Sequence, residues 1–206
     1  MIKNYNYKIA ISGKAKSGKD TVSKLFKKSL LNMIYSKSNV YCYSKLFSFA
    51  SPIKDMIKIM LPETKSKILN GSSQLRATKI PMLKNKNDDE ISYRDLLIHI
   101  GTIGRDYNEN IWINNLDFKL KKFLSSKYNT IGIVTDVRFK NEFDYLKSKN
   151  FCMIRIKRSS SLIIKDVSET QQDEIPDDKF DFIINNDGSK QDLLKEVERI
   201  SNLIKC

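Results

Sequence analysis

The sequence has few of the residues on which many catalytic sites depend. Its 206 residues include one histidine, His99, and three scattered cysteines, Cys42, Cys152 and Cys206. Because the cysteines are odd in number and lack metal-ligand spacing, they argue against a disulfide scaffold and a zinc site, and they indicate a reducing, cytoplasmic location (the host cytoplasm if the source is viral). His99 stands among apolar helical positions, so we expect a packing or surface role. The sequence offers no Ser-His-Asp set and no glycosidase-like carboxylate pair.

Long hydrophobic runs are also missing. No apolar stretch approaches the ~20 residues that a membrane-spanning helix needs, and the N-terminal residues lack the hydrophobic segment of a signal peptide. Hydrophobic residues make up 40% of the chain and charged residues 30%, which is typical of a globular protein. We therefore predict a single domain over residues 1–206, with no membrane partner.

Positive charge is in excess, with a formal net charge of +13. A basic face for nucleic acid is one interpretation. A basic cleft for phosphorylated small molecules, with further lysines on solvated surfaces, is the other. The lysines are dispersed, and no basic run is interleaved with the aromatic residues that stack on bases. We therefore favour the second interpretation and expect Lys84–Asp89 to be an exposed loop.

One segment near the N-terminus carries a specific signal. An apolar stretch, Tyr7–Ser12, is followed by the pattern G-x-x-x-x-G-K and then by apolar residues at helical spacing. Glycines let successive backbone N–H groups point at one anion, the helix start adds its positive dipole end, and the lysine reaches the outer phosphates of a nucleoside triphosphate. The expected ATP-binding residues of this loop are Gly13, Lys14, Ala15, Lys16, Ser17, Gly18, Lys19, Asp20 and Thr21.

The residue after Lys19 departs from the usual form of this motif. Asp20 stands where a Ser or Thr normally binds magnesium, and the hydroxyl of Thr21 comes one position later. Carboxylate and hydroxyl oxygens both suit Mg²⁺. Asp20 and Thr21 are therefore both candidates for the metal, and the sequence leaves the choice between them open.

Strand and helix patterns alternate along the chain. Strands are expected at Tyr7–Ser12, within Val40–Phe49, and at Thr130–Thr135, Cys152–Ile156 and Phe180–Asn185. Helices are expected at Lys19–Met33, from a cap at Ser51 to about Leu61, and through Trp112–Phe123. Another helix is expected to start at a Ser92/Asp95 capping box, with Leu96, Leu97, Ile100 and Ile103 facing inward. The last helix is expected at Ser189–Ile204, with Leu193, Leu194, Val197, Ile200 and Ile204 facing inward. This alternation predicts an α/β fold with a parallel sheet flanked by helices in three layers.

Two polar stretches interrupt the alternation. Residues 62–92 have little periodicity, and we predict a substrate-binding insert there. Residues 158–179 are predicted to form a small lid. Within the first stretch, Asn85-Lys86-Asn87-Asp88 spells the guanine-binding motif N-K-x-D of GTPases. It follows no buried strand and no D-x-x-G motif accompanies it, so we interpret it as a coincidence.

Polar residues follow the predicted strands, where ligands of open parallel sheets bind. Asp136, Arg138, Asn141 and Glu142 follow one strand, while Lys157 and Arg158 end the next. An Asp at a strand end can orient magnesium, and an arginine can hold a phosphate in a bidentate fork; an ion pair that caps the next helix is the alternative. Arg94 and Arg105 flank a predicted Gly101-Thr102 turn, where a phosphate site and surface charge both remain open.

Taken in order, the motifs resemble one family, the bacteriophage-type deoxynucleoside monophosphate kinases, relatives of adenylate kinase in the P-loop class. Ser17–Thr21 matches its S-G-K-D-T, and Phe49–Lys54 resembles F-A-D-P-[IL]-K with Ser51 in place of Asp. Arg94 and Leu97–Thr102 resemble the family's R-x-L-[LM]-Q-x-L-G-T, and Trp112 follows at the expected distance. Asp136–Glu142 resembles D-x-R-x-x-x-E. Ser168-Glu169 resembles [ST]-E, and Asn186-Asp187-Gly188 matches N-D-G. Ile98 and Asp166 differ from the family's usual Gln and His, so base preference is not carried over.

The resemblance implies a P-loop fold that transfers the γ-phosphoryl of ATP, with Mg²⁺, to a (deoxy)nucleoside 5′-monophosphate. It implies catalytic roles for Lys19, Asp136, Arg138 and Arg158, with Asn186 and Gly188 near the donor adenine. It also implies substrate-binding roles for Lys54, Arg94, Gly101, Thr102, Arg105, Trp112, Arg138, Glu142, Ser168 and Glu169. A homodimer is left open, and no nucleic-acid partner is expected.

Two alternatives remain at this stage. Another small-molecule P-loop kinase, of the phosphomevalonate or dephospho-coenzyme A type, has the same loop and differs in its acceptor. A nucleic-acid-binding ATPase is the second, and it predicts ATP hydrolysis that DNA or RNA stimulates.

Overall fold

A five-stranded parallel sheet forms the centre of one compact unit of the protein, built from residues 1–49 and 116–206. The computed structural model describes residues 6–39, 41–126, 128–159 and 167–204. The strand order is β2-β5-β1-β6-β7, and every pairing within this sheet is parallel. The strands are β1 (Asn6–Gly13), β2 (Tyr43–Phe47), β5 (Thr130–Val137), β6 (Cys152–Lys157) and β7 (Phe182–Asn185).

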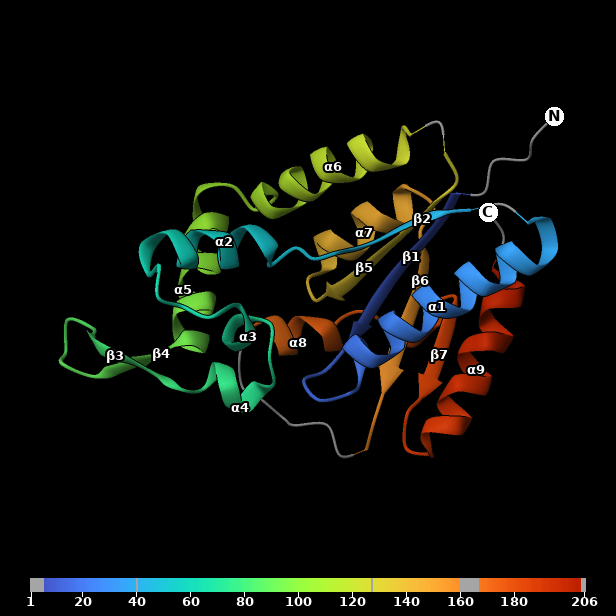
Figure 1. The fold of residues 1–206 in the computed structure, drawn as a ribbon. Coiled ribbons are helices and arrows are strands. Elements are labelled where there is room, and N and C mark those ends of the chain that lie inside the picture. Colours follow the sequence, from blue (N-terminus) through green and yellow to red (C-terminus); the bar gives the residue numbers. More distant parts are fainter. Residues whose placement is uncertain (1–5, 40, 127, 160–166, 205–206) are drawn as a thin grey trace. The chain divides into compact units, whose positions relative to one another are not determined.

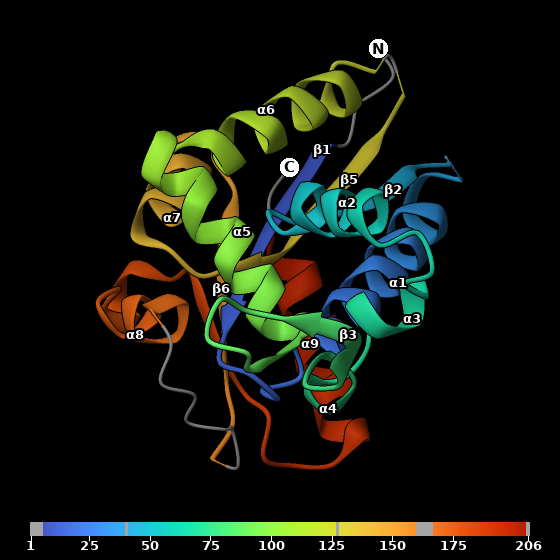
Figure 2. The ribbon, with the colours of Figure 1, turned by 90° about the vertical axis from the view of Figure 1, so that its left-hand side faces the viewer.

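Helices cover both faces of this sheet (Figures 1 and 2). On one face, α1 (Lys19–Ser38) and α9 (Lys190–Leu203) pack against each other. On the other face lie α6 (Ile111–Leu124) and α7 (Lys140–Ser148), which are joined by a hydrogen bond of 2.6 Å that the Tyr145 hydroxyl donates to Asp117 Oδ1. The three-layer α/β fold predicted from the alternating pattern is confirmed.

The core explains why these segments fold as they do. Val22, Phe26, Leu30 and Ile34 recur at every fourth position of α1 and are all buried, so one stripe of the helix faces the sheet. Alternate strand residues such as Ile9 meet it in the same apolar cluster. Burying one large side chain of this kind stabilises the fold by roughly 1.5–3 kcal/mol.

The order of the strands also sets where a ligand can bind. From β1 the chain runs first to β2 and β5 on one side, and then returns to β6 and β7 on the other. The crevice beyond the carboxyl ends of β1 and β6 is therefore a topological switch point, the usual ligand site of open parallel sheets. Gly13 pairs with Ile156 at this edge, so the glycine loop and the end of β6 meet there.

Residues Ala50–Asn115 form a second compact unit. Helix α2 (Ser51–Met60) packs against α5 (Tyr93–Tyr107), and an antiparallel hairpin is formed by β3 (Lys79–Lys84) and β4 (Glu90–Ser92). Two single-turn helices, α3 (Ser66–Leu69) and α4 (Ser73–Arg76), lie between α2 and the hairpin. The predicted insert, residues 62–92, falls inside this unit.

Several details of the predicted helices are wrong. Gly101 and Thr102 lie inside α5 rather than in a turn. Ser51 is the first residue of α2, and its N-cap is Ala50. Ile103 is 43% exposed and Leu194 is 38% exposed, although both were expected to face inward. For α5 the reason is that two glycines, Gly101 and Gly104, form part of the buried face, which a count of apolar positions overlooks.

Other local predictions are confirmed. Ser92 and Asp95 form the expected capping box at the start of α5. His99 is exposed, as its surface role requires. The predicted end of the strand Thr130–Thr135, by contrast, is wrong: β5 continues to Val137, so Asp136 is part of the strand rather than the residue after it.

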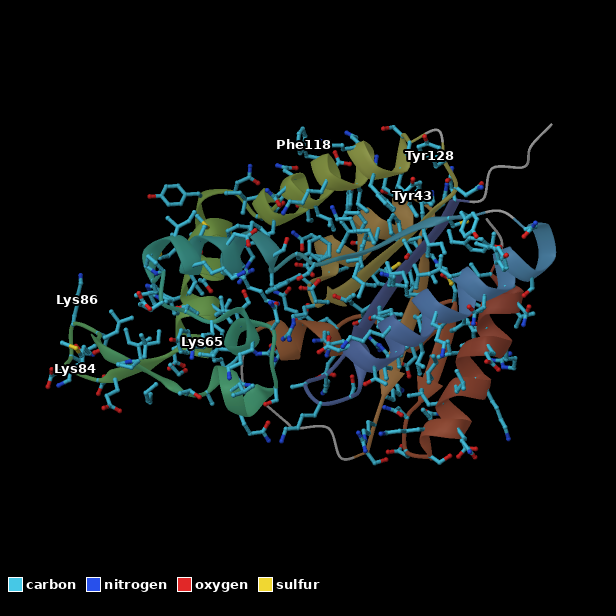
Figure 3. The ribbon with its side chains drawn as sticks, in the orientation of Figure 1. Tyr43, Lys65, Lys84, Lys86, Phe118 and Tyr128 are labelled. Atoms are coloured by element: carbon cyan, nitrogen blue, oxygen red, sulfur yellow. The ribbon has the colours of Figure 1, made fainter. Side chains whose placement is uncertain are left out.

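The N-K-x-D segment forms the turn of the β3–β4 hairpin. The Asn85 side chain accepts hydrogen bonds from the backbone N–H groups of Asn87 (2.8 Å) and Asp89 (3.0 Å), which closes the turn. Lys84 and Lys86 project outward at the end of the hairpin (Figure 3). The interpretation of this segment as an exposed loop is confirmed, and the side chain that a guanine-binding motif would use instead holds its own turn.

The predicted lid, residues 158–179, is described in part. Helix α8 spans Val167–Asp173, and a single 3₁₀ turn covers Asp177–Lys179. Residues 160–166, with Asp166, lie outside the described residues, as does Cys206. In the described residues, no helix is both long and apolar enough to cross a membrane.

Candidate active site

The glycine loop joins β1 directly to α1. Gly18 is the N-cap of α1 and has a φ of 99°, in the left-handed region that favours glycine. At the other end of the loop, a Cβ on Gly13 would lie 2.6 Å from the Ile156 carbonyl oxygen, so only glycine fits beside β6. The two glycines of the motif are thus required by geometry, one for conformation and one for close approach.

The Lys19 side chain folds back over the loop. Its ammonium donates to the carbonyl oxygen of Gly13 and, at 2.7 Å, to that of Lys14. The half-buried cation therefore lies at the start of the loop, which leads directly into the N-terminus of α1. A helix N-terminus and a fixed cation together make an anion site.

A cavity of about 630 Å³ opens beside the loop at the switch point. Its walls come from the loop, the end of β6 and the segment after it, the end of α8 and the turn after β7. The lining residues include Lys14, Arg155, Arg158, Asp173, Asp177 and Asp187. This volume lies within the range of small-molecule and cofactor sites.

Helix α8 is tied to the loop by an ion pair. Lys14 Nζ lies 2.8 Å from Asp173 Oδ1 at the end of α8, with both side chains partly exposed. An exposed pair of this kind contributes little to stability. It does place the end of α8, which lies within the predicted lid segment, beside the cavity that Lys14 and Asp173 both line.

Arg155 was missed by the sequence analysis. It points from β6 into the cavity wall, where its guanidinium donates to Asp177 Oδ1 (2.6 Å) and to the Gln172 carbonyl oxygen (2.8 Å), and stacks on the Phe180 ring at 4.1 Å. Hydrogen bonds from Lys157 and from Arg155 lower the pKa of Asp177. An arginine inside the otherwise apolar segment Cys152–Ile156 was the available signal.

Asp136 holds the end of β2. Its Oδ2 accepts a hydrogen bond of 2.6 Å from the Ser48 hydroxyl, and its Oδ1 accepts one of 2.9 Å from the Phe49 N–H. Both carboxylate oxygens are therefore engaged with the segment that leaves the sheet after β2. This arrangement gives Asp136 a structural task, and its predicted catalytic role stays a prediction.

Glu142 is buried and fixes the backbone of Arg138. Its Oε2 accepts hydrogen bonds from the N–H groups of Arg138 (2.8 Å) and Phe139 (3.1 Å), which caps α7. Burial, reinforced by the nearby Asp136 carboxylate, raises the pKa of Glu142 to about 8, against the opposing effect of the two N–H donors. The predicted contact of Glu142 with substrate stays a prediction, while its contact with the Arg138 backbone is direct.

In the second unit, Arg94 and Arg105 lie on one face of α5. They are eleven positions apart, which is close to three helical turns, so their directions around the helix differ by about 20°. A Cβ built on Gly101 would lie 3.5 Å from Nη2 of Arg105. This distance shows that the Arg105 side chain folds back along the helix toward Gly101. The guanidinium therefore lies about one turn nearer to Arg94 than its own backbone does. Thr102 is exposed on the same helix.

Trp112 packs inside the second unit. Its Nε1 donates to the Gly101 carbonyl oxygen at 3.0 Å. Its ring packs against Gly104 so closely that a Cβ on that glycine would lie 2.3 Å from Cζ2 of Trp112. Trp112 is 7% exposed. It therefore supports the part of α5 that carries Arg105, while its predicted contact with substrate stays a prediction. Lys54, on α2, donates to Asn70 Oδ1 at 3.0 Å.

The candidate metal ligands lie in the first turn of α1. Asp20 and Thr21 are both exposed there. In the described part of the chain, no group of three or more His, Cys, Asp or Glu residues is arranged to hold a metal. Mg²⁺ in phosphoryl-transfer sites is typically bound by one or two carboxylates together with substrate phosphates. One carboxylate and one hydroxyl beside the loop fit that donor set.

The remaining predicted residues lie around the turn after β7 and in α8. Asn186 Nδ2 donates to the Ser17 carbonyl oxygen at 2.8 Å, so this residue contacts the loop. Gly188 precedes the Ser189/Asp192 capping box of α9, and a Cβ there would lie 3.1 Å from Asp192 Oδ2. Ser168 and Glu169 belong to α8, and their side chains lie outside the described part of the structure.

Comparison with known proteins shows the family to which the chain belongs. A family model described as deoxynucleotide monophosphate kinase matches residues 63–197, well over half of the chain. This protein belongs to that family. The kinase is accordingly an ATP-dependent phosphotransferase that acts on a small-molecule nucleoside monophosphate, and the resemblance noted in the sequence is confirmed. The two alternatives, another small-molecule P-loop kinase and a nucleic-acid-binding ATPase, are not favoured.

Other comparisons add little to this assignment. A search of curated proteins found no match. The kinase also resembles the solved structure described as "Crystal structure of APE1195", with 12% identity, a TM-score of 0.39, and coverage of 98% of this chain and 96% of the other. The family match begins after the glycine loop, so the role of the loop rests on its own sequence and geometry.

Proposed function

We propose that the loop Gly13–Lys19 of this kinase binds the phosphates of ATP, and that the adjacent cavity takes the donor nucleoside. The observation that carries the proposal is the loop itself: a glycine-capped helix start, with the Lys19 ammonium held above it, at the switch point of a parallel sheet. The backbone N–H groups and the helix dipole stabilise anionic phosphate oxygens. The cavity of about 630 Å³ beside the loop has room for a nucleoside.

Arg138 and Arg158 are proposed to bind the transferring phosphoryl group. Both follow strands of the parallel sheet at its carboxyl edge, and the Arg138 backbone is fixed by the buried Glu142. An acceptor phosphate is already an anion, so no general base is required. Positioning and neutralisation of charge then supply most of the catalysis.

Magnesium is proposed as the cofactor, held by Asp20 or Thr21 together with the phosphates of ATP. When bound, the ion neutralises charge on the β- and γ-phosphate oxygens. The protein contributes an exposed carboxylate and hydroxyl in the first turn of α1.

The second unit is proposed to bind the acceptor monophosphate. Arg94 and Arg105 share one face of α5, and Gly101 leaves the space over which the Arg105 guanidinium folds. Planar guanidinium groups suit bidentate recognition of a phosphate. Lys54 is the further candidate for this phosphate.

An ATP-dependent phosphorylation assay over the common ribo- and deoxyribonucleoside monophosphates tests the proposal. We expect a diphosphate product from at least one deoxynucleoside monophosphate, and we expect Lys19→Ala to lose it. If Lys19→Ala retains wild-type turnover, the loop is not the donor site.

A further inference from the structure

The turn after β7 contacts the phosphate loop through one residue, Asn186. Its backbone is anchored first: the Asn186 N–H donates to the Lys157 carbonyl oxygen at 2.8 Å, which continues the β6–β7 pairing by one residue. The next residue, Asp187, accepts hydrogen bonds from the Ser159 N–H (2.8 Å) and hydroxyl (3.0 Å). The turn is therefore braced against the end of β6 at two points.

From this braced position the Asn186 side chain reaches the loop. Its Nδ2 donates to the Ser17 carbonyl oxygen at 2.8 Å. A Cβ on Gly18 would lie only 2.3 Å from the same Nδ2 atom. The amide of Asn186 thus fills the space that the missing side chain of Gly18 leaves, while it donates to the Ser17 carbonyl oxygen of the Ser17–Gly18 peptide.

The direction of that peptide matters for phosphate binding. A trans peptide is planar, so its carbonyl oxygen and its N–H point in opposite directions. Because the Ser17 carbonyl oxygen points to Asn186, the Gly18 N–H points away from Asn186. Gly18 is also the N-cap of α1, and its carbonyl oxygen accepts the first helical hydrogen bond, at 3.0 Å from the Val22 nitrogen. One side-chain hydrogen bond therefore orients a donor at the N-terminus of this helix.

We propose that Asn186 is a positioning residue that orients the phosphate loop, and that it does not select the donor base. The proposal rests on the donor-site function of the loop. Asn186 acts on phosphate binding through the Ser17–Gly18 peptide, so its removal weakens every ligand that uses the triphosphate, whatever its base. A residue that recognised the base would instead change the preference for ATP over GTP.

The test compares ATP, GTP and inorganic tripolyphosphate as ligands of the intact enzyme, by calorimetry or by displacement of a fluorescent ATP analogue. For Asn186→Ala we expect about tenfold weaker binding of all three, the size of one lost hydrogen bond, with the ratio of ATP to GTP affinity unchanged. In turnover assays, KM for ATP should rise while KM for the acceptor monophosphate stays the same. Asn186→Leu roughly keeps the side-chain volume but removes the hydrogen-bond donor, so we expect the same loss of affinity for all three ligands. This variant provides the test if Asn186→Ala does not fold.

Asn202→Ala is the matched control. Asn202 Nδ2 also donates to a backbone carbonyl oxygen, that of Glu198 at 3.0 Å, on the exposed surface of α9. We expect this variant to bind all three ligands as the wild type does. Unchanged tripolyphosphate affinity in Asn186→Ala, or an altered ATP-to-GTP ratio, overturns the positioning role. A wild-type enzyme that binds neither ATP nor tripolyphosphate overturns the donor site itself, and the inference with it.

Discussion

At the residue scale, Lys19 is the side chain that we propose links the loop to phosphoryl transfer. Its ammonium is held by carbonyl oxygens of the loop, so it is already positioned before any phosphate arrives. A pre-positioned charge stabilises a developing charge without the cost of reorganisation.

We expect Lys19→Ala to lower kcat by two to three decades, roughly 3–4 kcal/mol of transition-state stabilisation. Steady-state kinetics with saturating ATP and monophosphate measure the loss. Circular dichroism should show an intact fold, because the ammonium is only half-buried and Val22 and Phe26 keep α1 on the sheet. Near-normal turnover would remove the loop from the donor site.

Asp20 and Thr21 can be separated by their dependence on magnesium. We expect Asp20→Asn to raise the Mg²⁺ concentration needed for the half-maximal rate, since it replaces a carboxylate ligand by a neutral amide. ATP affinity in the absence of metal should change less. If only Thr21→Val shifts the magnesium dependence, the hydroxyl rather than the carboxylate serves the metal.

Glu142 makes stability depend on pH. Its pKa is about 8 in the folded protein, well above the value of a free glutamate, because the carboxyl is buried near Asp136. The folded state therefore keeps a proton that the unfolded state releases above about pH 4–5. The resulting stability is complete below that range and is lost as the pH rises towards 8.

We expect wild-type stability to fall between about pH 5 and pH 8, with a slope of at most about 1.4 kcal/mol per pH unit from this one group. Glu142→Gln keeps an oxygen to accept from Arg138 and Phe139 but cannot titrate, so its slope in that range should be smaller. Urea unfolding at a series of pH values measures both slopes. Parallel curves for the two proteins would show that Glu142 titrates as an ordinary carboxylate.

At the element scale, α5 shows how a helix can present two distant arginines together. The arginines share a face, and the missing side chain of Gly101 lets Arg105 fold back toward Arg94. Trp112 holds this part of the helix through the Gly101 carbonyl oxygen. A small residue between the two arginines, on the same side of the helix, thus determines how the Arg105 guanidinium is presented.

Replacing Arg94 or Arg105 with Lys should lower kcat/KM for the monophosphate by roughly one to three decades, because an ammonium does not reproduce the planar fork of a guanidinium. ATP binding measured without acceptor should change little. Arg199→Lys on α9, an exposed arginine paired with Glu196, should leave both quantities unchanged. An equal loss in ATP binding would move the two arginines to the donor side.

At the scale of the whole molecule, the excess of positive charge is distributed unevenly. The unit that carries the sheet holds 27 basic and 16 acidic residues, whereas the unit Ala50–Asn115 holds ten basic and eight acidic residues. The first unit also carries the phosphate loop. This distribution agrees with a basic site for phosphorylated small molecules.

We therefore expect DNA and RNA to leave ATP turnover unchanged at physiological salt. The protein should be retained on polynucleotide columns only at low ionic strength. Dispersed lysines contact few phosphates at once, so binding releases few counterions from the nucleic acid. ATPase assays with and without polynucleotide, over a series of salt concentrations, measure both effects. Stimulation that persists at physiological salt would restore a nucleic-acid function.

The sequence by itself was enough to predict the five strands of the parallel sheet and most of the helices that flank it, but not α7 or the β3–β4 hairpin. Hydrophobic periodicity reflects which face of an element is buried, and the G-x-x-x-x-G-K spacing reflects a local backbone conformation. Both are properties of neighbouring residues, so the first residues of α1 and β5 are predicted correctly, although α1 ends at Ser38 rather than Met33 and β5 at Val137 rather than Thr135. The capping box at Ser92 is local in the same sense.

Only the tertiary structure decided which groups the polar residues contact. Trp112, on α6, meets two glycines of α5, and Asn186 meets Ser17 from 169 positions away. None of these contacts leaves a period in the sequence, because each joins segments that become neighbours only after the chain has packed. The same reason explains Ile103, whose exposure follows from which side of α5 the glycines make available for packing.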